Sequence, residues 1–130
     1  MEQIEFVIKG PPVGINAKEH SKTSRRKYRQ WKESVTQVAT NVLPDDWEII
    51  ESAEVVVRIT NYHSGGFHDV DNVIKPIFDG MNGVVFGDDK QVRIVTSERV
   101  DVTIVISNPP NLVLDSLDRY DEFVYVSVEW

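Results

Sequence analysis

The sequence contains no cysteine, and no apolar run approaches the roughly 20 residues that a transmembrane helix needs. The absence of cysteine excludes disulfides, thiolate zinc sites and thiol nucleophiles. The start Met1-Glu2-Gln3 lacks the basic region of a secretory signal peptide, so we expect a cytoplasmic protein without a membrane partner. With 130 residues, 41% of them hydrophobic, the chain is long enough to bury the core of a single domain.

Basic residues are scarce, with 14 against 21 acidic ones and a net charge of -7. Over the whole chain this balance argues against a nucleic-acid partner, because a polyanion repels a polyanion. The distribution is uneven, however, since the first 43 residues hold eight basic and only four acidic residues. Seven basic side chains form one segment that predicts a polyanion-binding face: Lys18, Lys22, Arg25, Arg26, Lys27, Arg29 and Lys32. An ordinary solvated helix face explains the same cluster equally well.

The first half of the chain predicts a strand, a helix and a second strand. Residues 4–8 alternate as a strand, and the polar residues 14–23 predict a loop. Ser24 is the expected N-cap of a helix that ends at Pro44. Residues 53–59 are rich in β-branched side chains and predict the second strand. The helix carries one apolar stripe: Tyr28, Trp31, Val35, Val38 and Val42.

The second half predicts a further helix over residues 73–81, which either starts near Pro76 or bends there. Residues 92–95 and 100–106 are expected to form a hairpin, and residues 123–128 to form a final strand. This order of elements indicates an α+β single domain, with a mixed β-sheet and two main helices packed on one side of it.

Four aspartates and a lysine lie in the middle of the sequence. Asp69 and Asp71 are two residues apart, so an extended segment would place both on one face. Two carboxylates about 4 Å apart repel by about 4 kcal/mol at an effective dielectric constant of 20, which favours a cation between them. Hard oxygen ligands select Mg²⁺ or Mn²⁺, and Asp88-Asp89 could add a third carboxylate. With Lys75 to neutralise a phosphate or hold an attacking water, the set suits metal-assisted phosphodiester hydrolysis.

Each of these residues also has a simpler interpretation. The Asp-x-Asp pattern is common in solvated acidic turns. Asp71 or Asn72 could cap a helix, and Asp79 could pair with Lys75 at a spacing of four residues.

Three sequence blocks in this order resemble the RusA family of Holliday-junction resolvases, small endonucleases of bacteria and their prophages. The family pattern is Asp-x-Asp-Asn-x-x-Lys, Phe-Asp and Asp-Asp-x-Gln-Val. The corresponding residues here are Asp69-Val70-Asp71-Asn72-Val73-Ile74-Lys75, Phe78-Asp79 and Asp88-Asp89-Lys90-Gln91-Val92. Pro11-Pro12 and Asn16 are similar to the family's Pro-Pro-Ser-x-Asn start, and the likeness runs from about residue 3 to residue 107.

The resemblance implies a RusA-like domain over residues 1–110 and a Mg²⁺-dependent homodimer, with Mn²⁺ as a possible substitute. It implies cutting of four-way DNA junctions by paired, symmetric nicks that leave 5′-phosphates. It assigns catalysis to Asp69, Asp71, Asp89 and Lys75. Metal binding falls to Asp69, Asp71 and Asp89, with Asp88 ranked below Asp89. Asn72 and Asp79 are expected to support the geometry of the site.

Two departures from the family pattern weaken the expected affinity for a junction. Residues 62–68 contain no lysine or arginine where family members place an arginine run, and residues 111–130 add an acidic extension with an extra strand. The basic residues between 18 and 32 could replace the missing DNA contacts. A non-catalytic DNA-binding or recombination-accessory protein with the same fold is therefore one alternative. An acidic module that mimics nucleic acid for a basic partner is another.

Overall fold

The structure, a computed structural model, describes residues 1–19, 21–104 and 106–130, with the side chains of Lys18 and Glu19 outside the described part. No helix among these residues is both long and apolar enough to cross a membrane. The elements in chain order are β1 (Gln3–Lys9), the 3-10 helix η1 (Ile15–Glu19), α1 (Lys22–Val42), β2 (Val55–His63), α2 (Ile74–Met81), the 3-10 helix η2 (Asp89–Gln91), β3 (Val92–Asp101), α3 (Asn111–Arg119) and β4 (Phe123–Glu129).

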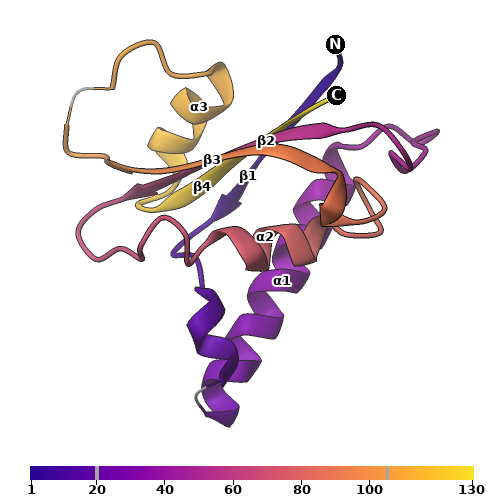
Figure 1. Ribbon diagram of the computed structural model, residues 1–130. Coiled ribbons are helices and arrows are strands. Elements are labelled where there is room, and N and C mark those ends of the chain that lie inside the picture. The colour runs from indigo at the N-terminus through magenta and orange to yellow at the C-terminus, as the bar shows by residue number, and fades with distance from the viewer. Residues whose placement is uncertain (20, 105) are drawn as a thin grey trace.

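The four strands form one mixed sheet in the order β1-β4-β2-β3 (Figure 1). Strand β4 is antiparallel to both neighbours, so that Val126 lies between Phe6 of β1 and Ile59 of β2. Strand β3 is parallel to β2. The first and last strands bring the two ends of the chain together, and the amide of Glu2 donates to the carbonyl of Trp130 at 2.8 Å. The predicted α+β class and mixed sheet are confirmed.

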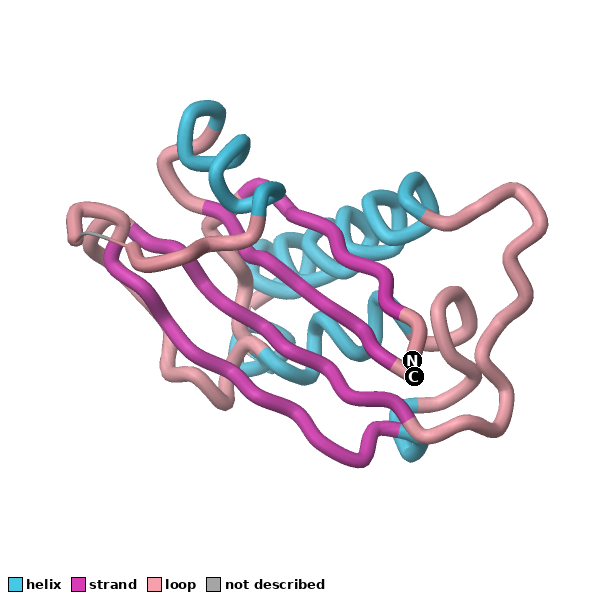
Figure 2. The backbone as a smooth tube through the Cα atoms, turned by 90° about the horizontal axis from the view of Figure 1, so that it is seen from above, coloured by secondary structure: helices cyan, strands magenta, loops and turns pink. Residues whose placement is uncertain are grey.

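Helices α1 and α2 pack on one face of the sheet, and α3 stands over the other (Figures 1 and 2). The predicted stripe on α1 buries Tyr28, Trp31 and Val35, whereas Val42 in the last turn is 43% exposed. Each fully buried aliphatic side chain stabilises the fold by about 1.5–3 kcal/mol. The main core therefore lies between the sheet and the α1–α2 layer.

Helix α1 begins at Lys22, two residues before the predicted N-cap at Ser24. The cap is Ser21, whose backbone is extended and whose side chain accepts a hydrogen bond from the amide of Ser24 at 3.1 Å. A serine stands at both positions, and sequence alone does not show which one takes the extended backbone that an N-cap requires. The predicted polar loop before the helix contains η1, a short 3-10 helix.

Helices α1 and α2 approach closely at Gly80. A Cβ atom at this position would lie 2.6 Å from the Cβ of Val35, which is too close for two carbon atoms. The hydroxyl of Thr36 donates to the carbonyl of Gly80 at 2.6 Å, so a hydrogen bond links the helices at the same point. Glycine at residue 80 therefore sets the separation of the two helices.

The predicted hairpin over residues 92–106 is wrong. Residues 92–101 form the single strand β3, which pairs along its length with β2. The polar residues 96–99 that suggested a turn include no glycine or proline, and they lie on an edge strand where solvent can reach their side chains. Residues 102–104, which follow β3, are not in a strand, and Val105 lies outside the described residues.

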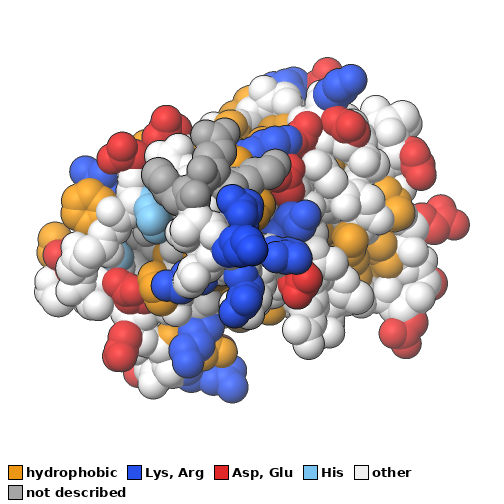
Figure 3. Space-filling view, turned by 90° about the horizontal axis from the view of Figure 1, so that it is seen from below, with side chains coloured by type: hydrophobic (Ala, Val, Ile, Leu, Met, Phe, Trp, Pro, Cys, Tyr) orange, Lys and Arg blue, Asp and Glu red, His pale blue; other side chains and the backbone are white. Residues whose placement is uncertain are grey.

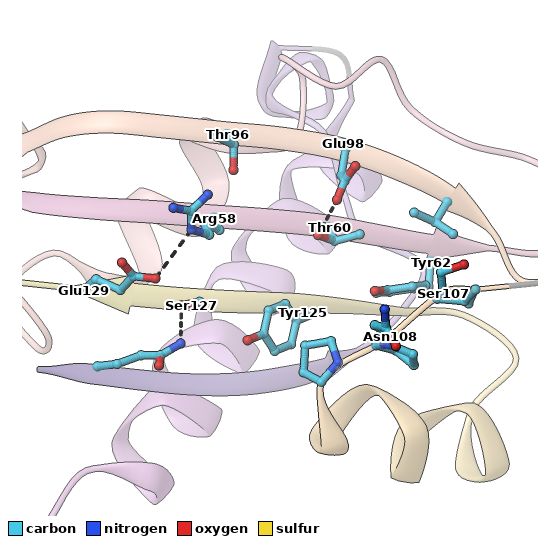
Figure 4. A pocket seen from close by; sticks show the side chains of 15 residues that line it. Arg58, Thr60, Tyr62, Thr96, Glu98, Ser107, Asn108, Tyr125, Ser127 and Glu129 are labelled. Atoms are coloured by element: carbon cyan, nitrogen blue, oxygen red, sulfur yellow. Dashed lines mark hydrogen bonds and ion pairs between the residues drawn. The ribbon is translucent and has the colours of Figure 1, made fainter.

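The face of the sheet opposite α1 and α2 carries a second, smaller core and a polar hollow. Helix α3 covers part of this face, and its Val113 clusters with Tyr62, Phe123 and Tyr125. Beyond α3 the face is open over a hollow of about 520 Å³, where Arg58 pairs with Glu129 at 3.4 Å (Figure 4). None of the aspartates singled out from the sequence lines this hollow, so it does not belong to the predicted site.

Candidate active site

Asp69 and Asp71 lie on a turn that leads into α2. The carbonyl of Asp69 accepts from the amide of Asn72 at 3.0 Å, and the carbonyl of Asp71 accepts from the amide of Ile74 at 3.4 Å. The extended segment predicted here is therefore wrong, and strand alternation does not determine where the two carboxylates point. Both residues are exposed to solvent. We call residues 69–73 the aspartate turn.

Both sides of the aspartate turn are fixed by other elements. On one side, the hydroxyl of Ser97 in β3 donates to the carbonyl of Val70 at 2.5 Å. On the other, the carbonyl of Asn72 accepts from the amide of Ile15 at 2.9 Å, and its side-chain Oδ1 accepts from the amide of Asn16 at 3.3 Å. The turn therefore depends on tertiary contacts with β3 and with the start of η1.

The segment before η1 is fitted closely to Asn72. A Cβ atom at Gly14 would lie 2.1 Å from Nδ2 of Asn72, so this position excludes every other residue unless the asparagine moves. His68 joins the same contact, with its Nε2 3.1 Å from the carbonyl of Pro12 and its Nδ1 3.4 Å from Nδ2 of Asn72. The contacts of Asn72 are those of a residue that orients the turn.

Lys75 connects α2 to Asp89, the first residue of η2. Its Nζ lies 2.6 Å from Oδ2 of Asp89 and 3.1 Å from Oδ1 of Asp79. The hydrogen bond from Lys75 holds the pKa of the Asp89 carboxyl below its ordinary value. The hydrogen bonds with Asp89 and Asp79 raise the pKa of Lys75 above its ordinary value, so this residue is an ammonium at neutral pH.

The first turn of α2 explains how Lys75 is placed. Pro76 lies in this turn, where its missing N–H removes no intrahelical hydrogen bond, so the predicted start near Pro76 is confirmed. The N-cap is Val73, without a side-chain cap, so neither Asp71 nor Asn72 caps α2. The pairing of Lys75 with Asp79 that the spacing of four residues predicted is present.

Lys75, Asp79 and Asp89 form a group of ion pairs that we call the Lys75 network. Tyr28 connects this network to α1, the helix that carries the basic residues. Its hydroxyl donates to Oδ2 of Asp79 at 3.0 Å. Burial, followed by the hydrogen bond to the Asp79 carboxylate, raises the pKa of Tyr28 to about 12. The sequence analysis assigned Tyr28 only to the apolar stripe. Helical periodicity predicts that its ring faces the core, and it does not predict which residue its hydroxyl contacts.

Asp88 and Asp89 are neighbours with different partners. The carboxylate of Asp88 accepts from the amide of Lys90 at 2.8 Å, and the side chain of Gln91 accepts from the amide of Asp88 at 3.0 Å. This capping box begins η2, and Gln91 also donates to the carbonyls of Ile50 and Ala53. Asp88 thus has a structural task, whereas Asp89 faces Lys75.

The donor chemistry of Asp69, Asp71, Asp88 and Asp89 fits Mg²⁺. All four carry hard carboxylate oxygens, and all four are at least partly open to solvent. Within the described parts of the chain, no three histidine, aspartate or glutamate side chains are gathered closely enough to hold a metal ion. Asp89 instead has an ammonium as its partner in this arrangement.

The basic residues of α1 gather on one face of the molecule (Figure 3). Lys32 is half-buried, and the other five are exposed: Lys22, Arg25, Arg26, Lys27 and Arg29. None of the six forms an ion pair with a described side chain. The side chain of Lys18 lies outside the described residues. We call the six basic residues of α1, from Lys22 to Lys32, the α1 basic face.

The family model described as endodeoxyribonuclease RusA matches residues 10–107. The matched span includes the aspartate turn, α2, η2 and β3, whereas β1 and β4 lie wholly outside it. No curated protein matches the chain.

Proposed function

The chain belongs to the RusA family of endodeoxyribonucleases, which resolve Holliday junctions, and on this premise we propose that it cuts four-way DNA junctions by metal-dependent, paired and symmetric nicks that leave 5′-phosphates. The observation that supports the proposal most directly is the contact of Lys75 with Asp89 at 2.6 Å. These residues belong to different sequence blocks, and their contact brings α2, and with it the aspartate turn, next to η2.

We assign Asp69, Asp71 and Asp89 as the carboxylates that would hold Mg²⁺, or Mn²⁺ in its place. Asp88 ranks below Asp89 because its carboxylate is occupied by the cap of η2. When bound, the metal lowers the pKa of water and neutralises negative charge on the phosphodiester. The exposed position of Asp69 and Asp71 leaves both open to a backbone phosphate from solution.

Lys75 contributes a fixed positive charge next to Asp89. Its raised pKa keeps it protonated, so it serves as an electrostatic partner for a phosphate or an attacking water and does not act as a general base. Asp79 holds the ammonium from the second side, and Tyr28 holds Asp79. Asn72 acts as a positioning residue for the aspartate turn.

We propose that the α1 basic face binds the phosphates of the DNA arms. These residues supply the positive potential that the acidic chain otherwise lacks, and they remain unpaired with described carboxylates. Tyr28 belongs to the same helix, so the helix that would bind DNA also contacts the Lys75 network.

A homodimer fits this substrate, because an isologous pair of subunits has two equivalent sites for two equivalent cuts. The absence of cysteine is compatible with a reducing compartment, and we propose that the protein acts in the cytoplasm.

One assay tests the proposal. Purified protein is incubated with end-labelled four-way junction, flap or plain duplex, with and without Mg²⁺ or Mn²⁺. We expect two symmetric nicks in the junction only when metal is present, with ligatable 5′-phosphates. Binding of the junction without any cleavage would favour the non-catalytic accessory protein instead.

A further inference from the structure

A hollow of about 410 Å³ lies next to the aspartate turn and is not used by the function proposed above. Its lining comes from separate parts of the chain, with Gly66 and Phe67 in the loop before the turn, Asn61 in β2 and Glu122 before β4. The volume lies within the range of pockets that bind small organic groups. The question is which chemical group these side chains suit.

Phe67 presents an aromatic ring at this hollow. The side chain is 50% exposed, although burying it would be favourable. The guanidinium of Arg99 lies 4.0 Å from the ring centroid, and the ring of His63 is 4.9 Å away. Cation–π and ring contacts therefore orient Phe67 while half of its surface stays available.

The polar groups of the hollow favour a neutral ring with hydrogen-bond donors over a phosphate. Glu122 places a carboxylate in the lining, and the lining includes no lysine or arginine. Asn61 is 2% exposed, and its Oδ1 is a buried acceptor without a partner among the described residues. A nucleobase has a flat π-face for Phe67 and N–H groups for such acceptors.

Resting on the proposed function, we propose that this hollow receives one nucleobase withdrawn from its pair at the branch point of the DNA, stacked on Phe67. The Cα atoms of Phe67 and Asp69 are at most about 7 Å apart, because two residues of extended chain span no more. The captured base would thus lie beside the phosphodiester presented to the aspartate turn. Since continuous stacking is interrupted at a branch point, a base is cheaper to withdraw there than inside a duplex, and the hollow would favour branched DNA.

The experiment places 2-aminopurine, a fluorescent base, at successive positions around the branch point of a four-way junction and in a matched duplex. Binding is measured with Ca²⁺ in place of Mg²⁺, so the readout does not depend on cleavage. Phe67→Ala removes the ring, and Phe67→Tyr keeps it. Gly66→Leu adds a bulky side chain to the lining, and the fold can accept it because a Cβ at Gly66 has no neighbour within 4 Å. The matched control is Leu114→Ala, because Leu114 is 49% exposed on α3.

The wild-type protein should raise the fluorescence at one branch-point position and leave the duplex signal unchanged. Phe67→Ala and Gly66→Leu should lose this signal and bind the junction about 5- to 100-fold more weakly, with unchanged duplex affinity. Phe67→Tyr and Leu114→Ala should behave as wild type. Equal signals in wild type and Phe67→Ala would overturn the base site alone, whereas failure of the wild type to bind any branched DNA would overturn the proposed function as well.

Discussion

The ammonium of Lys75 lies 2.6 Å from Oδ2 of Asp89, fourteen residues further along the chain. This ion pair joins α2 to η2. The hydrogen bond from Lys75 lowers the pKa of the Asp89 carboxyl and so favours its ionised form. An ionised carboxylate is the form that a metal ion or a developing positive charge requires. The pair therefore has a functional interpretation that a surface salt bridge alone would not.

Replacing Lys75 should separate function from stability. We expect Lys75→Met to reduce junction cleavage by at least about tenfold, because the positive charge near the phosphate is lost. The side chain is 51% exposed, so the free energy of unfolding should fall by less than about 1 kcal/mol. Single-turnover cleavage and urea unfolding measure the two effects. A drop in stability large enough to explain the lost activity would contradict this assignment.

Asp71→Asn should abolish metal-dependent cleavage while the protein remains folded. The exchange removes one of the proposed carboxylate ligands, keeps the size of the side chain and leaves the backbone contacts of the aspartate turn available. Asp118→Asn, an exposed position on α3, is the matched control and should cleave as wild type. Circular dichroism checks folding, and the labelled junction checks activity. Unchanged nicking by Asp71→Asn would refute the site.

Tyr28→Phe should destabilise the protein in a pH-dependent way. The hydrogen bond to Asp79 stabilises the neutral phenol, so wild type should exceed the variant by about 1–2 kcal/mol at pH 7. The pKa of Tyr28 is raised from 10.0 to about 12 on folding. The contribution is therefore complete below pH 10 and decreases as the pH rises through about 12. Urea unfolding of both proteins from pH 7 to pH 11 measures the difference, which a pH-independent gap would contradict.

The α1 basic face should make junction binding sensitive to salt. The logarithm of the affinity should fall with the logarithm of the salt concentration, with a slope of about -0.9 for each phosphate neutralised. The double variant with Arg25→Gln and Arg29→Gln should have a less steep slope, smaller by the contribution of about two phosphate contacts. The comparison is Arg93→Gln, a residue that pairs with Glu54 at 3.2 Å. Filter binding over a range of NaCl concentrations gives the slopes, and a double variant with the wild-type slope would exclude this face.

Removal of residues 111–130 should prevent the remaining chain from folding. The extension contains β4, which forms hydrogen bonds with both β1 and β2. Without it, β1 has no partner strand in the sheet, and the buried side chains of β4 leave a gap across the core. A chain ending at residue 110 should show no cooperative thermal transition. A folded, cooperative fragment would mean that residues 1–110 form an independent domain.

Local sequence determined most elements of this fold. The stripe of α1, the start of α2 near Pro76 and the final strand were predicted, because each depends on spacing or on the chemistry of one residue. Residues 92–106 were misread, because an edge strand tolerates polar side chains that resemble a turn. Periodicity shows which faces are apolar, and it does not show which strands become neighbours.

The candidate site divides in the same way. The three sequence blocks identified the acidic and basic residues of the family pattern, since that chemistry can be read from residue type and order. The family resemblance already ranked Asp89 above Asp88, and the tertiary structure supplied the physical reason, because Asp89 faces Lys75 whereas Asp88 caps η2. The tertiary structure also brought the hydroxyl of Tyr28 to Asp79 across 51 residues. Such contacts depend on how α1, α2 and η2 pack together. They join residues that are far apart in the sequence, and no local sequence pattern predicts them.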